Sequence, residues 1–343
     1  MIQKPHLGFV LGKFMPPHQG HVFMCEFARQ YCEKLIILVC SLENEPIPGR
    51  LRYEWMKEMF PDCHVVHETR DLLQEPRSDD DVEFWDQWKS AVRYAMQSEA
   101  HTWSVDGSPW NYPDVVFASE DYGHKLAETV GARFVPVDIS RTTRSISGTE
   151  IRENPFANWE FIPPAVRPHF VKRVCLFGPE STGKSTLAEY LGNAYKTVVA
   201  PEYGRTYTEA FGHENLTHDD LRHIVEGHVA TVAAAKRQAN KILIEDTDPV
   251  MTAVWSDMLL GKRDAWFDTF ADYADLYLLT DVDIPWVNDG TRYFDNDADR
   301  RRFFETCEAE LVKRKVRYVK VSGDITQRVD TASKAINLLL EEK

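Results

Sequence analysis

Short apolar runs alternate with amphipathic stretches from one end of the chain to the other. The apolar runs cover residues 7–11, 35–40, 64–67, 115–118 and 133–137 in the first half and residues 174–177, 197–200, 242–244, 276–279 and 317–321 in the second. Runs of this kind, separated by helical stretches, are typical of parallel sheets with helices on both faces. The pattern therefore predicts an α/β protein with two parallel sheets, one in each half of the chain.

The two halves are joined by a segment rich in proline and aromatic residues. Residues 154–168 contain four prolines, so they cannot form one regular helix. We therefore place a domain boundary near Arg167, which predicts a first domain of residues 1–166 and a second domain of residues 167–343. The longest helix is expected over residues 217–239.

Composition and charge narrow the class of protein. A chain of 343 residues that is 43% hydrophobic can bury two cores. Its net charge of −14 argues against nucleic acid as a partner, because binding to nucleic acid requires a basic surface. The six cysteines form no CxxC pair, as expected for reduced intracellular thiols. No apolar stretch approaches the roughly 20 residues of a membrane helix and no signal peptide is visible, so we expect a cytoplasmic protein without a membrane partner.

A first phosphate-binding signature, GKFMPPHQGH, lies at residues 12–21, directly after the first apolar run. Gly12 and Gly20 allow a close approach of the backbone to a ligand. His18 and His21 are three residues apart, so they share one face of the first helical turn and can donate to the triphosphate of ATP. The alternative is a pair of surface histidines that only cap a helix.

A second part of this site is expected at residues 146–152, ISGTEIR. Ser147 and Thr149 can cap a short helix and contact phosphates, and Arg152 supplies fixed positive charge. Together the two segments resemble the nucleotidylyltransferase superfamily, whose members carry (H/T)xGH early and ISxTxxR late on a Rossmann-like sheet. The resemblance covers residues 6–155 of this sequence.

This resemblance implies that a phosphate or carboxylate oxygen attacks the α-phosphorus of a nucleotide and that pyrophosphate leaves. A phosphomonoester is already ionised at about pH 7, so positioning and charge stabilisation carry the reaction without a general base. The residues expected to act in catalysis are Lys13, His18, His21 and Arg152. The residues expected to bind the nucleotide or its partner substrate are Gly12, Phe14, Ser119, Tyr122, Ser147 and Thr149.

The second signature, GPESTGKS at residues 178–185, is a complete P-loop motif between an apolar run and a helical stretch. It predicts a kinase of the P-loop fold, in which backbone N–H groups surround the phosphates of ATP. Lys184 is expected to reach the β- and γ-phosphates, and Ser185 is expected to ligate Mg²⁺. The residues expected to contact the nucleotide are Gly178, Ser181, Thr182, Gly183, Ser185 and Thr186.

Acidic residues follow two of the apolar runs in the second half. Asp246 stands where a metal-ligating carboxylate belongs in this fold, so it is expected to share Mg²⁺ with Ser185. Transfer of a phosphoryl group to a hydroxyl also needs a proton acceptor. Glu202 is the expected base and Asp248 is the rival.

A glycine-containing loop at residues 286–292 leads toward three consecutive arginines. Arg292 is expected to belong to a lid that closes over the transferring phosphoryl group. The alternative is an ordinary surface charge.

The order of these motifs, with EYGR at 202–205, DTD at 246–248 and DGTR at 289–292, resembles the NadR family. In that family a nicotinamide mononucleotide (NMN) adenylyltransferase is fused to a ribosylnicotinamide kinase. The resemblance implies that the second domain phosphorylates nicotinamide riboside with ATP to give NMN. It implies that the first domain then joins NMN to the AMP part of ATP, giving NAD and pyrophosphate.

Aromatic residues near both signatures are candidates for stacking on the flat pyridinium ring. In the first domain these are Trp85 and Trp88, and in the second domain they are Trp255 and Tyr203. Because Trp85 and Trp88 are three residues apart on a predicted helix, packing into the core is an equal alternative for them.

Two other functions are compatible with the motifs. A fusion of phosphopantetheine adenylyltransferase with dephospho-coenzyme-A kinase shares both reaction types and the domain order, although the EYGR and DTD segments favour nicotinamide substrates. A nucleotide-sensing regulator with little turnover fits less well with complete HQGH and GKS motifs. Some NadR proteins carry an N-terminal helix-turn-helix domain, and because this chain begins close to its first strand, we expect no DNA binding. A homo-oligomer is compatible with the sequence, which does not specify the oligomeric state.

Overall fold

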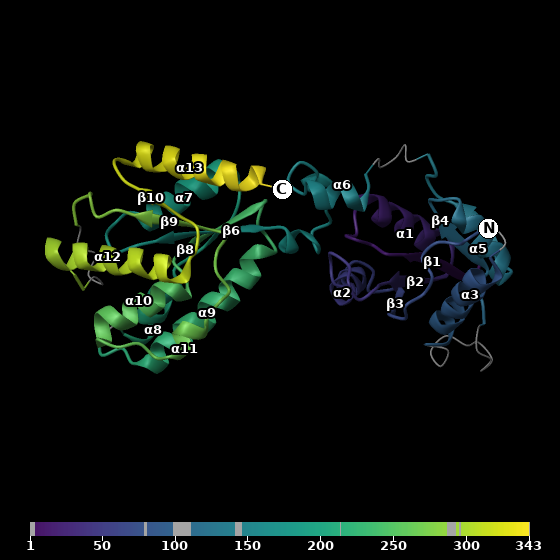
Figure 1. The fold of residues 1–343 in the computed structure, drawn as a ribbon, viewed down its shortest axis with the longest axis horizontal. Helices are drawn as coiled ribbons and strands as arrows, with labels where there is room; N and C mark the ends of the chain where they lie inside the picture. The colour runs from purple at the N-terminus through teal and green to yellow at the C-terminus, as the bar shows by residue number, and fades with distance from the viewer. Residues whose placement is uncertain are drawn as a thin grey trace. The chain divides into compact units, whose positions relative to one another are not determined.

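The chain forms two compact units, Met1–Arg167 and Pro168–Lys343, each with its own sheet (Figure 1). The computed structural model describes residues 4–78, 81–98, 111–140, 146–212, 214–286, 293–294 and 296–342. Within these residues, no helix combines the length and the apolar character that a membrane crossing would require. Two short 3₁₀ helices, η1 (Trp159–Phe161) and η2 (Arg167–His169), interrupt the proline-rich segment, as its prolines predict.

The first unit contains a five-stranded parallel sheet in the order β3-β2-β1-β4-β5. The order reverses between β1 and β4, which opens a crevice at the carboxyl ends of these strands. The strands are β1 (Leu7–Gly12), β2 (Lys34–Cys40), β3 (His64–Glu68), β4 (Val115–Ala118) and β5 (Arg133–Pro136). The helices are α1 (Gln19–Tyr31), α2 (Gly49–Met59), α3 (Val82–Gln97), α5 (Tyr122–Val130) and α6 (Gly148–Glu153).

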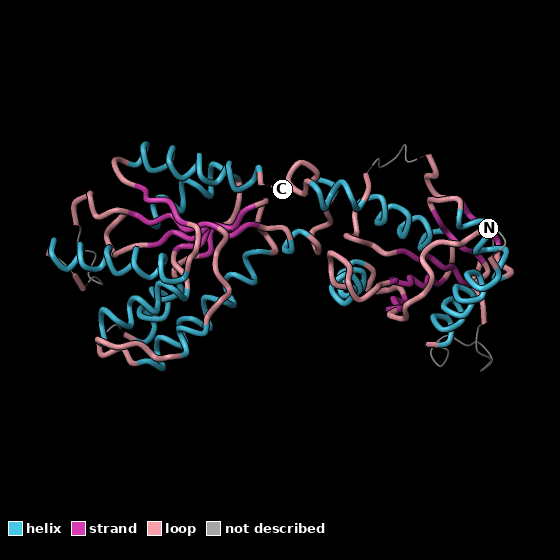
Figure 2. Tube along the Cα trace, viewed as in Figure 1, coloured by secondary structure: helices cyan, strands magenta, loops and turns pink. Residues whose placement is uncertain are grey.

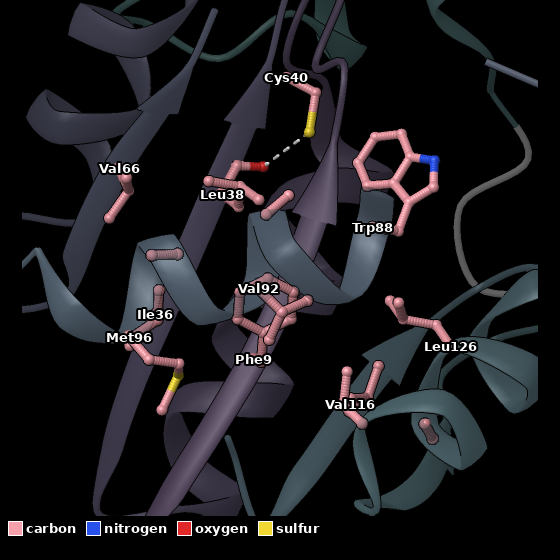
Figure 3. Packing of buried hydrophobic residues seen from close by; sticks show 14 of the residues in the cluster. Phe9, Ile36, Leu38, Cys40, Val66, Trp88, Val92, Met96, Val116 and Leu126 are labelled. Atoms are coloured by element: carbon pink, nitrogen blue, oxygen red, sulfur yellow. Dashed lines mark hydrogen bonds between the residues drawn. The ribbon is translucent and has the colours of Figure 1, made fainter. Parts of the chain in front are cut away.

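Alternate side chains of this sheet enter two separate cores. The cluster in Figure 3 joins Phe9, Ile36 and Leu38 from the sheet to Trp88 and Val92 of α3. The opposite face packs against α1 and α2 through a second cluster that includes Val10, Ile37, Val39, Met24 and Met56. Because both faces are covered, the central strands β1, β2 and β4 are mainly apolar rather than alternately polar.

The second unit contains a five-stranded parallel sheet in the order β10-β9-β6-β8-β7. Figure 2 shows its strands in magenta, with helices in cyan on either side of them. Its strands are β6 (Lys172–Phe177), β7 (Val199–Ala200), β8 (Ile242–Asp246), β9 (Leu276–Thr280) and β10 (Tyr318–Val321). Helices α7 (Lys184–Tyr195) and α13 (Ile325–Glu341) cover one face, and α10 (Pro249–Leu260) and α12 (Asp297–Arg314) cover the other. The remaining helices are α8 (Tyr203–Phe211), α9 (His218–Lys236) and α11 (Trp266–Thr269).

The prediction of an α/β protein with two parallel sheets is confirmed, and each predicted strand is present. Strands β6 and β8 are each two residues longer than predicted, whereas β7 is shorter and begins at Val199 rather than at residue 197. The N–H of Thr197 donates to the carbonyl of Gly192 at 2.9 Å, so Thr197 ends helix α7 instead of starting a strand.

A buried ionic cluster lies within the apolar interior of the second unit. Arg173 of β6, Glu245 of β8 and His228 of α9 are 6%, 0% and 3% exposed. The guanidinium of Arg173 holds the Glu245 carboxylate, with Nη2 at 3.0 Å from Oε2, and His228 Nε2 lies 3.5 Å from the same oxygen. Burial would raise the pKa of Glu245, but nearby His228 and the hydrogen-bonded Arg173 outweigh burial and lower it.

We expect Arg173→Ala to lower the free energy of unfolding of the second unit by about 3–5 kcal/mol, because it leaves the Glu245 charge buried without its main partner. The matched control is Lys172→Ala on the same strand. Lys172 is partly exposed and pairs with Asp275 at 3.0 Å, so its loss is expected to cost less than about 1 kcal/mol. Native-state hydrogen exchange of the β6 and β8 amides measures both values, and equal losses would contradict this account.

Candidate active sites

The first site is a cavity of about 920 Å³ at the carboxyl ends of β1 and β4. It collects residues from the loop after β1, the start of α1, helix α3, the loop after β4 and helix α6. All the site residues that the sequence predicts for the first domain line it, namely Gly12, Lys13, Phe14, His18, His21, Ser119, Tyr122, Ser147, Thr149 and Arg152. Segments more than 100 residues apart in the chain therefore meet in one cavity.

The two histidines begin helix α1 as a reciprocal cap. The N–H of Gly20 donates to His18 Nδ1 at 3.2 Å, and the N–H of His18 is directed at His21 Nδ1 at 3.4 Å. Their rings stack with centroids 3.7 Å apart. Because Nδ1 accepts in both rings, a neutral ring carries its proton on Nε2, which is the nitrogen that can then donate to an anion.

The loop before these histidines has a strained backbone that α6 supports. Phe14 is buried and has a φ of 48°, in the left-handed region that residues with a side chain rarely adopt. Arg152 donates to the carbonyl of Met15 and to Thr149 Oγ1, the latter at 3.0 Å. A Cβ on Gly148 would lie 2.5 Å from that Met15 carbonyl oxygen, so a glycine is required where α6 meets the loop.

The aromatic residues of the first site differ in burial. Trp88 is 9% exposed, belongs to the core cluster and donates from Nε1 to the carbonyl of Leu73 at 3.1 Å. Trp85 is half-buried, and both tryptophans line the cavity. Trp88 is therefore both a core residue and part of the cavity wall. The hydroxyl of Tyr122 donates to the carbonyl of Leu11 at 3.3 Å, and burial raises its pKa, so the phenol stays protonated at neutral pH.

The second site is a cavity of about 210 Å³ around the P-loop. Lys184 lies over the loop, and its ammonium donates to the carbonyls of Gly178 and Pro179 at 3.0 and 2.7 Å. Gly178 has a φ of 135°, and a Cβ there would lie 2.7 Å from Thr280 Oγ1. The predicted residues that line the cavity are Ser181, Thr182, Gly183, Lys184, Ser185, Thr186 and Glu202, whereas Gly178 shapes the loop from below.

Ser185 and Asp246 form a pair of oxygen ligands beside the P-loop. The Ser185 hydroxyl donates to Asp246 Oδ2 at 2.6 Å. Asp246 is 5% exposed, and its Oδ1 is buried with no hydrogen-bond partner among the described residues. These oxygens suit a hard cation such as Mg²⁺. Because the described part of the chain has no cluster of three or more metal-ligating side chains, the nucleotide and water would supply the other ligands.

The two candidate bases occupy different environments. Glu202 is half-buried at the start of α8 and lines the cavity. Asp248 is 1% exposed and does not line it; its carboxylate accepts hydrogen bonds from the Tyr277 hydroxyl at 2.6 Å and from the Met251 N–H at 3.0 Å. Burial raises the pKa of Asp248. Asp248 therefore caps helix α10 inside the protein, and of the two candidate bases Glu202 is the one that lines the cavity.

One wall of the second cavity is aromatic. Trp255 and Tyr293 both line it, with ring centroids 5.8 Å apart. The P-loop residue Glu180 accepts from the N–H of Tyr293 at 2.8 Å, which ties this wall to the phosphate loop. Sequence reasoning missed Tyr293 and Glu180, because Tyr293 belongs to no motif and Glu180 occupies a variable position of the P-loop motif. Tyr203 does not line the cavity and instead packs against Gly227, and the predicted lid residue Arg292 lies outside the described residues.

Comparison with known proteins covers both units. Residues 173–328 match the family described as AAA domain, and residues 9–154 match the family described as Cytidylyltransferase-like. The chain is 31% identical to the trifunctional NAD biosynthesis/regulator protein NadR of Escherichia coli, over 94% of this chain and 80% of the relative. It is 30% identical to the protein of the same name from Salmonella typhimurium, over 93% of this chain and 79% of the relative.

Two solved structures share the fold of nearly the whole chain. One is a crystal structure of a NadR protein in complex with NR, with a TM-score of 0.74 at 24% identity. The other is a NadR protein in complex with NAD and AMP-PNP, with a TM-score of 0.75 at 23% identity. In both cases the match covers 99% of this chain and 97% of the other.

We expect Asp248→Ala to lower the free energy of unfolding of the second unit by about 1–3 kcal/mol, because it leaves the Tyr277 hydroxyl buried without an acceptor. Glu202→Ala is the control, since its side chain is only half-buried, and it is expected to change stability by less than about 1 kcal/mol. Urea denaturation of both variants measures the difference. A stable Asp248→Ala protein would remove the argument for a capping role.

Proposed function

The chain belongs to the NadR family, and we propose that it catalyses two successive ATP-dependent steps of NAD formation. The second unit phosphorylates nicotinamide riboside to NMN, and the first unit adenylylates NMN to NAD with release of pyrophosphate. The observation that carries this proposal is the presence of two separate phosphate-binding cavities in one chain, one with the HxGH loop and one with the P-loop. The relatives hold NR in one structure and NAD with AMP-PNP in the other, which supports these ligands here.

Adenylyl transfer in the first cavity depends on holding two anionic substrates together. A phosphate oxygen of NMN attacks the α-phosphorus of ATP, the bond to the β-phosphate oxygen breaks, and pyrophosphate leaves. The nucleophile is already ionised, so the protein supplies position and positive charge rather than a base. Lys13, His18 and His21 are placed to donate to the phosphates, and Arg152 holds the loop through Met15.

Phosphoryl transfer in the second cavity needs a donor loop, a cation site and a base. The P-loop N–H groups and Lys184 bind the β- and γ-phosphates, and Ser185 with Asp246 would hold Mg²⁺. Bound Mg²⁺ neutralises charge on the phosphate oxygens. Glu202 accepts the proton of the ribose hydroxyl as that oxygen attacks the γ-phosphorus, and ADP leaves.

The aromatic wall suits a flat cationic ring. Trp255 and Tyr293 form a surface next to Glu202 that can stack on the pyridinium of nicotinamide riboside. Trp85 offers a similar surface to NMN in the first cavity. In the coenzyme-A alternative the first cavity would hold phosphopantetheine, which lacks such a ring, so Trp85 favours a nicotinamide substrate there.

The two activities are expected to be separable by single substitutions. Lys184→Ala removes the ammonium that binds the transferring phosphate, so it abolishes formation of NMN while NAD is still made from supplied NMN. His21→Ala is expected to do the reverse. Mass spectrometry identifies the products after incubation with ATP, Mg²⁺ and either nicotinamide riboside, NMN or phosphopantetheine. Turnover of phosphopantetheine alone, or loss of both activities in one folded variant, would refute the proposal.

Glu202→Gln is expected to lower kcat of the kinase reaction by about a hundredfold, because it keeps the shape of the side chain and removes the proton acceptor. The KM for ATP is expected to change little, since the P-loop and Lys184, rather than Glu202, bind the phosphates of ATP. Steady-state kinetics with nicotinamide riboside measures both constants. Near-normal kcat would require another proton acceptor.

A further inference from the structure

Helix α2 carries an arginine whose side chain is buried in the protein instead of lying on its surface. Arg52 is 0% exposed. Its Nε donates to the carbonyl of Ile47 at 3.0 Å, and Nη1 donates to the carbonyl of Cys40 at 3.1 Å and to the carbonyl of Lys13. A buried guanidinium is tolerated only when its donors are satisfied. Three of the acceptors of Arg52 are main-chain carbonyls, and one of them belongs to the phosphate loop of the first site.

The carboxylate of Glu45 connects Arg52 to the side chain of Lys13. Its Oε2 pairs with Arg52 Nη2 and accepts from the N–H of Leu42 at 3.0 Å. Its Oε1 lies 3.3 Å from the Lys13 ammonium. Burial would raise the pKa of Glu45, but the Leu42 N–H and the two cations outweigh burial and lower it, so the group is charged at neutral pH. Glu45 is thus shared by two positive side chains.

The peptide that Arg52 holds adjoins the strained residue of the loop. Phe14 follows Lys13 directly and has a φ of 48°. A residue with a side chain keeps such a conformation only where its surroundings impose it. Arg52 holds the carbonyl that precedes Phe14, and Arg152 holds the carbonyl of Met15 that follows it. Two arginines from different helices therefore fix both sides of this residue.

We propose that Arg52 and Glu45 are positioning residues for adenylyl transfer, a statement that rests on the proposed function of the first unit. Arg52 fixes the peptide between Lys13 and Phe14, and Glu45 directs the Lys13 ammonium. Neither residue lines the cavity, so both act through Lys13 rather than on substrate. When the phosphates of ATP enter, they become the partner of Lys13, and Glu45 remains held by Arg52 and the Leu42 N–H.

The test is kcat for NAD formation from NMN and ATP in the full chain. Arg52→Met is expected to lower kcat by about a hundredfold, because small displacements of a catalytic group have effects of this size. Arg50→Met, two residues earlier on the same helix, is the matched control: its side chain is 79% exposed and pairs only with Glu54 in the described structure. The control is expected to keep wild-type kcat.

A double-mutant cycle with Lys13→Ala separates positioning from a general loss of structure. If Arg52 acts through Lys13, adding Arg52→Met to Lys13→Ala lowers kcat by no more than about twofold further. Persistence of the full loss in the Lys13→Ala background would overturn the proposal, as would near-normal kcat in Arg52→Met.

If circular dichroism shows that Arg52→Met does not fold, Glu45→Gln replaces it as the test variant, because the amide keeps the shape of the carboxylate. It is expected to lower kcat by about tenfold, and to have no further effect on Lys13→Ala. Unchanged kcat in this variant would overturn the proposal. The wild-type chain is assayed before any variant. If it makes no NAD from NMN, that result refutes the proposed function rather than the positioning roles of Arg52 and Glu45.

Discussion

Both sites depend on a loop whose backbone is held in a conformation that an L-residue adopts only at a cost of about 1–3 kcal/mol. Phe14 in the first loop and Ser181 in the P-loop have φ values of 48° and 57°. In the P-loop the next residue, Thr182, has its carbonyl held at 2.8 Å by Nη1 of Arg328, which is 3% exposed. Each phosphate loop is thus supported by a buried arginine that donates to a main-chain carbonyl of the loop.

The fold and the motif residues of both sites could be predicted because they leave local signals. The central strands β1, β2, β6, β8 and β9 are mostly apolar runs with buried side chains, and each phosphate loop has glycine and basic residues at fixed spacing. Parallel strands then bring their carboxyl ends to one edge, so residues as distant as Lys13 and Arg152 meet without any long-range information.

Other features could not be predicted, because they depend on where one strand ends or on contacts with main-chain atoms. In the segment EDTD, β8 ends at Asp246, Thr247 turns with a φ of 73°, and Asp248 becomes a buried helix cap. A shift of one residue would have exchanged these roles. Arg52 bonds to carbonyls, which every residue type provides, so no side-chain pattern marks its partners.

The docking of α6 on the first phosphate loop has a consequence for synthesis of the chain. The hydrogen bond from Arg152 to Met15 joins residues 137 positions apart, and the close approach of Gly148 occurs at the same place. On a ribosome, the strand and loop that begin the first site emerge early, but the site stays incomplete until nearly the whole unit has been translated. The first phosphate loop therefore gains the support of α6 as one of the last events in the folding of the first unit, shortly before the P-loop strand emerges.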